Sequence, residues 1–193
     1  YKLGALPFEI LVEDGQWDSY LPIYEPQAEK YETWGCTAWG AQNQIETYFK
    51  KVFNFEPNYN EIFTYIKAGI GIGGANPQNA YESIRKDGLL NYDLIPFPNT
   101  FEEFIKTDVT QFEVKAKKWL QDYDFYHEWL EKPTKNTIKE MLKVSPIAVG
   151  VTAWYEDGEF YIDKGLPNTH WCLAYGYKNT KYGIALKIFD TYD

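Results

Sequence analysis

The sequence predicts an α+β fold in which helices come first and an antiparallel sheet follows. One early stretch has apolar residues at i, i+3, i+4 and i+7, the spacing of a helix with one buried face: Ile45, Tyr48, Phe49 and Val52. Beyond Pro146 the period changes to that of strands, with turn residues between segments. We therefore expect a single domain of 193 residues. Its helical lobe spans about 27–110, and its β lobe spans about 111–193 and includes an N-terminal arm, 1–26.

Start and stop signals place the helices. The first is expected to begin near Cys36 and to end near Asn54. Another is expected from Pro77 to Gly88, because Asn76 is a favourable N-cap, proline fits the first helical position and glycine fits the end. Shorter helices are expected over three further segments: 58–67, 100–103 and 136–143.

The strands are expected in the second part of the chain. Four segments beyond Pro146 have the strand pattern: 147–154, 160–162, 169–177 and 182–189. Hairpin-type turns are expected at Glu156-Asp157-Gly158 and at Lys178-Asn179-Thr180-Lys181. Two earlier segments, 112–115 and 125–130, are also strand-like, so the region between the lobes is expected to be mixed.

Composition excludes several classes of function. The net charge is −9, with no cluster of Lys and Arg, so nucleic acid and anionic membrane surfaces are poor partners. No apolar run approaches the roughly 20 residues of a membrane span. No signal peptide is recognised, and the chain begins at Tyr1, so the compartment stays open and the domain could be part of a larger or virion-associated polypeptide. Two cysteines make no disulfide framework, and both are expected to be free.

Cys36 is the first candidate for chemistry. It stands in an aromatic, glycine-containing turn at the expected start of a helix, where unpaired N–H groups and the helix dipole favour negative charge. A thiolate is stabilised there, and the thiolate is the nucleophilic form of cysteine. A buried, inert cysteine is the common alternative, so the assignment depends on a suitable base elsewhere in the chain.

His170 and Asp190 supply that base and its orienting group. His170 begins an expected strand 134 residues after Cys36, and Asp190 ends the next apolar strand. Neighbouring strands could bring the carboxylate to the imidazole, which would then accept the thiol proton. The other histidine, His127, is expected to be a solvent-facing strand residue without a catalytic role. Gly69, Gly71 and Gly74 match a nucleotide-binding glycine pattern only literally, because a helix-like segment precedes them and nucleotide-binding context is missing.

Five segments resemble those of the papain-like cysteine peptidases, over nearly the whole chain. They are Gly35-Cys36-Thr37-Ala38-Trp39, Gly73-Gly74-Ala75-Asn76-Pro77, Ser145-Pro146-Ile147-Ala148-Val149, His170 with 173–177, and Asp190-Thr191-Tyr192. The separation of Cys36 and His170 also fits the family's spacing of about 130–150 residues.

The resemblance implies a two-lobed fold and hydrolysis of peptide or isopeptide bonds in a protein substrate, with no metal or organic cofactor. Cys36, His170 and Asp190 would form the triad, and Gln27 with the Cys36 N–H would hold the oxyanion. It also implies that four residues contact the substrate: Trp34, Gly73, Gly74 and Thr169.

The chain departs from the family's pattern at several positions. Asp190 replaces the usual asparagine, Thr37 replaces an aromatic residue, and the usual disulfide cysteines are missing, which fits a short bacterial or phage-type member. The family's glutamine lies six residues before the cysteine, where this chain has Lys30, so the assignment of Gln27 requires a three-residue insertion.

Two alternatives remain. One is a catalytically silent papain-like module with a structural or binding role, as in a phage particle. The other is a cell-wall peptidase of the NlpC or CHAP type, although those domains place their histidine much closer to the cysteine.

Overall fold

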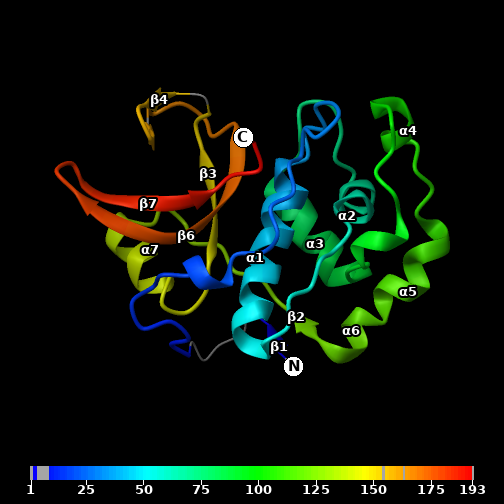
Figure 1. Cartoon of the computed structure of the whole chain (residues 1–193), viewed down its shortest axis with the longest axis horizontal. Coiled ribbons are helices and arrows are strands. Elements are labelled where there is room, and N and C mark those ends of the chain that lie inside the picture. The colour runs from blue at the N-terminus through cyan, green and yellow to red at the C-terminus, as the bar shows by residue number, and fades with distance from the viewer. Residues whose placement is uncertain (1, 4–8, 154, 163, 193) are drawn as a thin grey trace.

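The computed structural model describes residues 2–3, 9–153, 155–162 and 164–192. The helix α1 (Cys36–Phe53) lies along the middle of the molecule, with the other helices of the first half on one side and the main sheet on the other (Figure 1). The remaining helices are α2 (Glu61–Lys67), α3 (Pro77–Asp87), α4 (Phe101–Ile105), α5 (Glu113–Lys117), α6 (Trp119–Asp122) and α7 (Lys135–Met141). The strands are β1 (Lys2–Leu3), β2 (Asp124–Phe125), β3 (Ile147–Val151), β4 (Glu156–Asp157), β5 (Phe160–Tyr161), β6 (His170–Thr180) and β7 (Gly183–Phe189).

The main sheet is antiparallel with the order β3-β6-β7. Val151 of β3 lies opposite His170 of β6, and Leu173 lies opposite Phe189 at the end of β7. This register places the residue after Phe189, which is Asp190, beside the first residues of β6. The sheet therefore brings together two positions that are 20 residues apart in the sequence.

α1 packs closely on β6 through Gly40. A Cβ added at Gly40 would lie 2.8 Å from Trp171 Cδ1 and 3.3 Å from the Trp171 carbonyl oxygen, so only glycine allows this approach. Since Trp171 follows His170 directly, the contact sets the distance between the first turn of the helix and the start of the strand.

Buried polar groups join α1 to the helical lobe. The Gln42 amide donates hydrogen bonds to the Asn60 carbonyl (3.1 Å) and to Thr64 Oγ1 (2.7 Å). Glu46 Oε1 accepts the Tyr59 N–H at 2.7 Å. Around these bonds, apolar side chains of α1 and α3 form one core, which includes Ala41, Ile45, Phe49 and Ile84.

Several expected element boundaries are confirmed. α3 begins at Pro77 with Asn76 accepting the Gln78 N–H, and Gly88 ends it with a positive φ. Thr100 forms a capping box at the start of α4, and β4 and β5 form the expected hairpin around Gly158. Both cysteines are free. Trp154, which was expected to end the first strand of the sheet, lies outside the described residues.

Other expectations are wrong. The segments 112–115 and 125–130 do not form the expected strands: α5 begins at Glu113, and β2 contains only Asp124 and Phe125. Buried Ala116 and Trp119 stand at helical spacing, and this overrides the local alternation. Val52 is 39% exposed, because the buried face of α1 lies along Ala38, Ala41, Ile45 and Phe49.

His127 also differs from its expectation. It lies in no strand, and its side chain is largely buried, with Nε2 2.9 Å from Glu82 Oε1. The rings of Tyr81, Phe125 and Trp129 pack around it. The Glu82 carboxylate and this aromatic surface together hold His127 inside the molecule.

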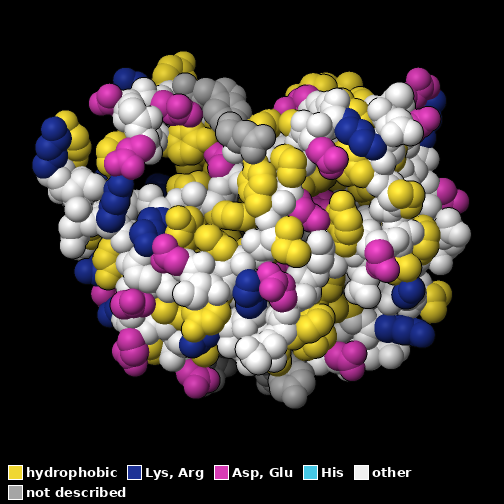
Figure 2. All heavy atoms as spheres, viewed as in Figure 1, with side chains coloured by type: hydrophobic (Ala, Val, Ile, Leu, Met, Phe, Trp, Pro, Cys, Tyr) yellow, Lys and Arg dark blue, Asp and Glu magenta, His cyan; other side chains and the backbone are white. Residues whose placement is uncertain are grey.

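Acidic and basic side chains are interspersed on the face of the molecule drawn in Figure 2, and hydrophobic atoms lie among them. This face therefore carries no continuous patch of one charge. Among the residues that the structure describes, no helix has both the length and the apolar character needed to cross a bilayer.

We predict that Gly40→Ala lowers the free energy of unfolding by about 1–3 kcal/mol, because the added methyl overpacks the contact with Trp171. Chemical denaturation measures the change. Gly71→Ala is the control, since nothing lies within 4 Å of a Cβ built at Gly71, and its effect should stay within about 0.5 kcal/mol. A Gly40→Ala variant that is as stable as the original chain would show that the contact yields without cost.

A second prediction concerns Glu46. Burial raises the pKa of this carboxyl well above its usual range, against the lowering effect of the Tyr59 N–H, and the nearby charges of Glu25 and Glu56 raise it further. The folded state thus binds this proton more tightly than the unfolded state, and stability declines as pH rises from the ordinary pKa through the folded one.

Glu46→Gln should therefore raise Tm at neutral pH and flatten its decline between acidic and neutral pH, because the amide oxygen still accepts the Tyr59 N–H without carrying charge. Thermal unfolding at several pH values measures both effects. An unchanged Tm at neutral pH would contradict the cost assigned to this buried carboxylate.

Candidate active site

Cys36 is the first residue of α1, and Gly35 stands at the N-cap. A Cβ at Gly35 would collide with the Trp39 ring, so the turn before Cys36 requires glycine. The Gly35 N–H donates to Thr33 Oγ1 (3.2 Å), and Thr33 Oγ1 donates to the Gln27 carbonyl (2.9 Å). The thiol therefore stands at the N-terminal end of an 18-residue helix, where the helix dipole favours negative charge. The turn before it is held by the Thr33 hydrogen bonds and by the contact of Gly35 with Trp39.

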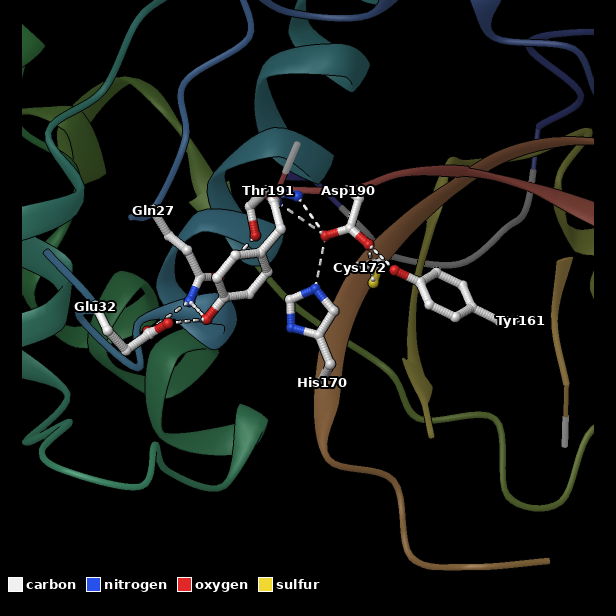
Figure 3. A network of polar contacts seen from close by, with 8 residues as sticks. Gln27, Glu32, Tyr161, His170, Cys172, Asp190 and Thr191 are labelled. Carbon is white, nitrogen blue, oxygen red and sulfur yellow. Dashed lines mark hydrogen bonds and ion pairs between the residues drawn. The ribbon is translucent and has the colours of Figure 1, made fainter. Parts of the chain in front are cut away.

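His170 and Asp190 are brought together by the main sheet. His170 Nε2 lies 2.7 Å from Asp190 Oδ1, and the His170 side chain is only 4% exposed. Figure 3 shows the two side chains pointing toward one another, with the second ring nitrogen directed away from Asp190. Nδ1 is thus the nitrogen left for the Cys36 thiol.

Asp190 is held as a carboxylate by several donors. Its Oδ1 also accepts the N–H groups of Thr191 (2.6 Å) and Tyr192 (3.1 Å), and its Oδ2 accepts the Tyr161 hydroxyl. Burial raises the pKa of Asp190, but the hydrogen bonds from His170 and Tyr161 outweigh burial and lower it to about 2. The group is therefore ionised at neutral pH.

The groups around His170 keep its imidazole ring protonated. Burial lowers its pKa, but hydrogen bonds with Asp190, Cys172 and Cys36 prevail and raise it to about 12. The imidazole therefore binds a proton firmly at neutral pH, close to a thiol at a helix start. This arrangement can generate a nucleophile.

Gln27 is buried close to the triad, where three groups bind its side-chain amide. Its Nε2 donates to Tyr192 Oη (2.7 Å) and to Glu32 Oε1 (3.3 Å), and its Oε1 accepts the Thr191 hydroxyl (2.7 Å). Figure 3 shows Glu32 directed at this amide from the side opposite His170. The Gln27 Nε2, which an oxyanion would need as a donor, is thus already bonded to two oxygens within the chain.

Tyr192 and Glu32 connect Gln27 to the triad. The Tyr192 hydroxyl donates to Glu32 Oε2 at 2.6 Å, and its ring lies 5.1 Å from the His170 ring. The Tyr192 ring therefore covers one side of the imidazole while its hydroxyl is fixed at the far end. Burial and the Glu32 carboxylate both raise the pKa of Tyr192, so the hydroxyl stays neutral.

The four residues expected to contact substrate come from both lobes. Gly73 and Gly74 have φ values of 87° and 85°, and a Cβ at Gly74 would lie 3.5 Å from the Trp34 carbonyl oxygen. The glycine turn thus runs beside Trp34, which itself has a φ of 55°. On the β lobe, Thr169 is exposed directly before His170, and its N–H is bonded to the Val151 carbonyl.

A cavity of about 700 Å³ lies between the lobes. Trp171 and Gly150 line it from the sheet, and Tyr81 lines it from α3. The Asn168 side chain packs against Gly150, since a Cβ there would lie 2.7 Å from Asn168 Nδ2. Gly150 pairs with Trp171 in the sheet, and among the described residues neither Cys36 nor His170 lines the cavity.

Four further residues of the site were missed from the sequence: Glu32, Tyr161, Cys172 and Tyr192. Tyr192 had a signal, because it lies within the Asp190-Thr191-Tyr192 segment. Cys172 also had one, since positions i and i+2 of a strand share a face with His170. Tyr161 and Glu32 had none, because their contacts depend on how a hairpin and a loop fold back on the site.

No protein-family model and no curated protein matches the sequence. Solved structures do. A digestive procathepsin L 3 from Tenebrio molitor larval midgut has a TM-score of 0.67 at 13% identity, over 92% of this chain and 59% of that one. A clostridial cysteine protease after propeptide cleavage has a TM-score of 0.66 at 13% identity, over 90% and 48%. The bromelain protease of Ananas comosus has a TM-score of 0.62 at 15% identity, over 92% and 81%.

These likenesses establish the fold, which is papain-like: a helical lobe against a lobe built on an antiparallel sheet. The chain spans only 59% and 48% of the lengths of the first two structures.

Proposed function

We propose that the chain is a cysteine peptidase that cleaves peptide or isopeptide bonds by acyl transfer through a Cys36–His170–Asp190 triad. One observation carries the proposal: the buried His170 ring is bound by Asp190 at Nε2, and the Cys36 thiol at the start of α1 is among the groups that raise the pKa of the ring. The papain-like fold supports it, because its neighbours include proteases. The missing disulfide cysteines favour a short bacterial or phage-type member.

The mechanism follows from the geometry. The Cys36 thiolate attacks the substrate carbonyl carbon, and the Cys36 N–H stabilises the oxyanion that forms, since it is unpaired at the helix start. The His170 imidazolium gives its proton to the leaving amine, and the neutral ring then activates water to hydrolyse the thioester. Asp190 fixes the ring and stabilises its charged form throughout.

Gln27 is proposed as the second oxyanion donor. Glu32 competes with the oxyanion for the N–H groups of the Gln27 amide. A substrate oxygen would have to replace Glu32 Oε1, which accepts at 3.3 Å and is the weaker of the two amide contacts. Substrate binding would thus pull the amide away from the carboxylate. If this exchange does not occur, the second candidate function applies: a catalytically silent papain-like module that binds a partner.

Substrate is proposed to lie between the lobes as an extended peptide. Gly73, Gly74 and Trp34 would bind it from the helical lobe through backbone groups, and Thr169 would contact it from the β lobe. The cavity behind Trp171 and Gly150 would receive a large apolar side chain, because aromatic rings form much of its wall.

Alkylation of the thiols tests the triad. Iodoacetamide should label Cys36 rapidly at neutral pH, and His170→Ala should slow the reaction by at least about 100-fold because the proton acceptor is lost. Asp190→Asn should keep more of the rate than Asp190→Ala, since the amide can still accept a hydrogen bond from the ring. Mass spectrometry of the labelled peptides measures the rates. Slow and equal labelling of Cys36 and Cys172 would support the silent module instead.

Gln27→Ala separates the oxyanion hole from the nucleophile. Peptide hydrolysis forms an oxyanion, whereas alkylation by iodoacetamide does not. The variant should therefore lose about 100- to 1000-fold in kcat while Cys36 alkylation changes little. Hydrolysis at the original rate would remove Gln27 from the mechanism, and a parallel loss in both assays would assign it a structural role.

Gly150→Val tests the cavity. The added methyl groups crowd Asn168 and narrow the space beside Trp171. We expect kcat/KM to fall more for peptides with a large apolar side chain than for peptides with a small one, as a fluorogenic peptide library would measure. An equal loss for every peptide would show that the cavity does not select substrates.

A further inference from the structure

A second thiol lies behind the proposed triad. Cys172 stands two residues after His170 in β6, so both side chains leave the same face of the strand, and Asp190 follows the neighbouring β7. Cys172 is fully buried, and its Sγ lies 3.8 Å from Asp190 Oδ2 (Figure 3). One nitrogen, one sulfur and one oxygen, from His170, Cys172 and Asp190, all lie within 4.8 Å of one another.

This set of donors matches the chemistry of zinc. Zn²⁺ binds imidazole nitrogen and carboxylate oxygen at about 2.0–2.2 Å and thiolate sulfur at about 2.3 Å, so donors of a tetrahedral site are about 3.2–3.8 Å apart. The present separations are 2.7 Å between His170 Nε2 and Asp190 Oδ1 and 3.8 Å between Cys172 Sγ and the other carboxylate oxygen, Asp190 Oδ2. A small spreading of the three side chains would therefore accept the ion.

We propose that His170 Nε2, Cys172 Sγ and a carboxylate oxygen of Asp190 form a zinc site in which the metal inhibits the chain. Zinc would replace the proton between His170 and Asp190 and the proton of the Cys172 thiol, and both protons would pass to solvent. The charges of the thiolate and the carboxylate would then balance that of the ion inside the protein. A water molecule would complete the tetrahedron.

The exposure of the Asp190 side chain and its hydrogen bond from Tyr161 both fit a metal site. Asp190 is the most exposed of the three side chains, at 17%, so the ion can reach the site past the carboxylate. Tyr161 donates to Asp190 Oδ2, and this bond would orient the carboxylate beside the ion. Cys172 has no step in the proposed acyl transfer, so the metal site uses a group that hydrolysis does not need.

Inhibition, unlike binding, rests on the proposed function. A His170 ring that is bound to zinc through Nε2 carries its remaining proton on Nδ1, the nitrogen left for Cys36. That nitrogen can no longer accept the thiol proton, and the ring cannot become an imidazolium. Zinc should therefore slow alkylation of Cys36 and stop hydrolysis without contacting the nucleophile.

Cobalt(II) binding can be detected by absorption spectroscopy, so it tests the metal site without any activity measurement. Cobalt(II) chloride added to the full chain should give a thiolate-to-cobalt charge-transfer band. Cys36→Ser is the matched control: it removes the nucleophile, keeps all three ligands and should retain the band. Cys172→Ala should lose the band, and Cys172→Ser, which keeps the side-chain volume closer to the original, should lose it too.

Zinc chloride then tests inhibition. The original chain and Cys172→Ala are each compared with their own metal-free rate of Cys36 alkylation, and the zinc concentration that halves this rate should rise at least about tenfold in Cys172→Ala. A cobalt band that persists in Cys172→Ala but disappears in Cys36→Ser would place the metal on the nucleophile and overturn the proposal. The absence of any cobalt band in the original chain would overturn it as well. If Cys36 proves unreactive while the band depends on Cys172, the peptidase proposal fails and the metal site stands.

Discussion

The His170 imidazole is the centre on which the rest of the site depends. Burial alone would make it a neutral ring, yet the Asp190 carboxylate at 2.7 Å and the adjacent thiols keep it protonated. Asp190 can do this because it is itself stabilised by two backbone N–H groups and the Tyr161 hydroxyl. The charge of one ring is thus supported by Asp190, which accepts from β5 and from the chain after β7, and by the thiol at the start of α1.

The fold supplies the distances that this interaction requires. The pairing of β6 with β7 places Asp190 beside His170, and the close contact of Gly40 with Trp171 holds the start of α1 against the same strand. Cys36 and His170 come from different lobes, so their meeting is a property of the packed molecule. The same packing encloses Cys172, so one histidine is proposed to have two roles: a proton carrier for Cys36 and a ligand for a metal ion.

The sequence was sufficient where local rules decide the outcome. α3 starts at Pro77 after Asn76 and ends before Gly88 because capping is a local effect. The pairing of His170 with Asp190 could also be expected from their flanking segments and order, whereas their catalytic role stays a prediction. The sequence was insufficient where tertiary packing decides. Val52 continues the apolar stripe but faces outward, and His127 is enclosed by rings that only the fold brings together. The bonds of Gln27 to Glu32 and Tyr192 belong to this second kind, since the three residues meet through loops.

Nitrogen-15 NMR of the imidazole groups is the most direct test of whether the His170 ring is protonated. The chain has two histidines, and His127→Gln assigns their signals. The account predicts that both ring nitrogens of His170 stay protonated through neutral pH and far into the alkaline range, toward about 12. It also predicts that Asp190→Ala weakens this retention. A His170 ring that loses its proton near the ordinary value of about 6.5 would contradict the central claim.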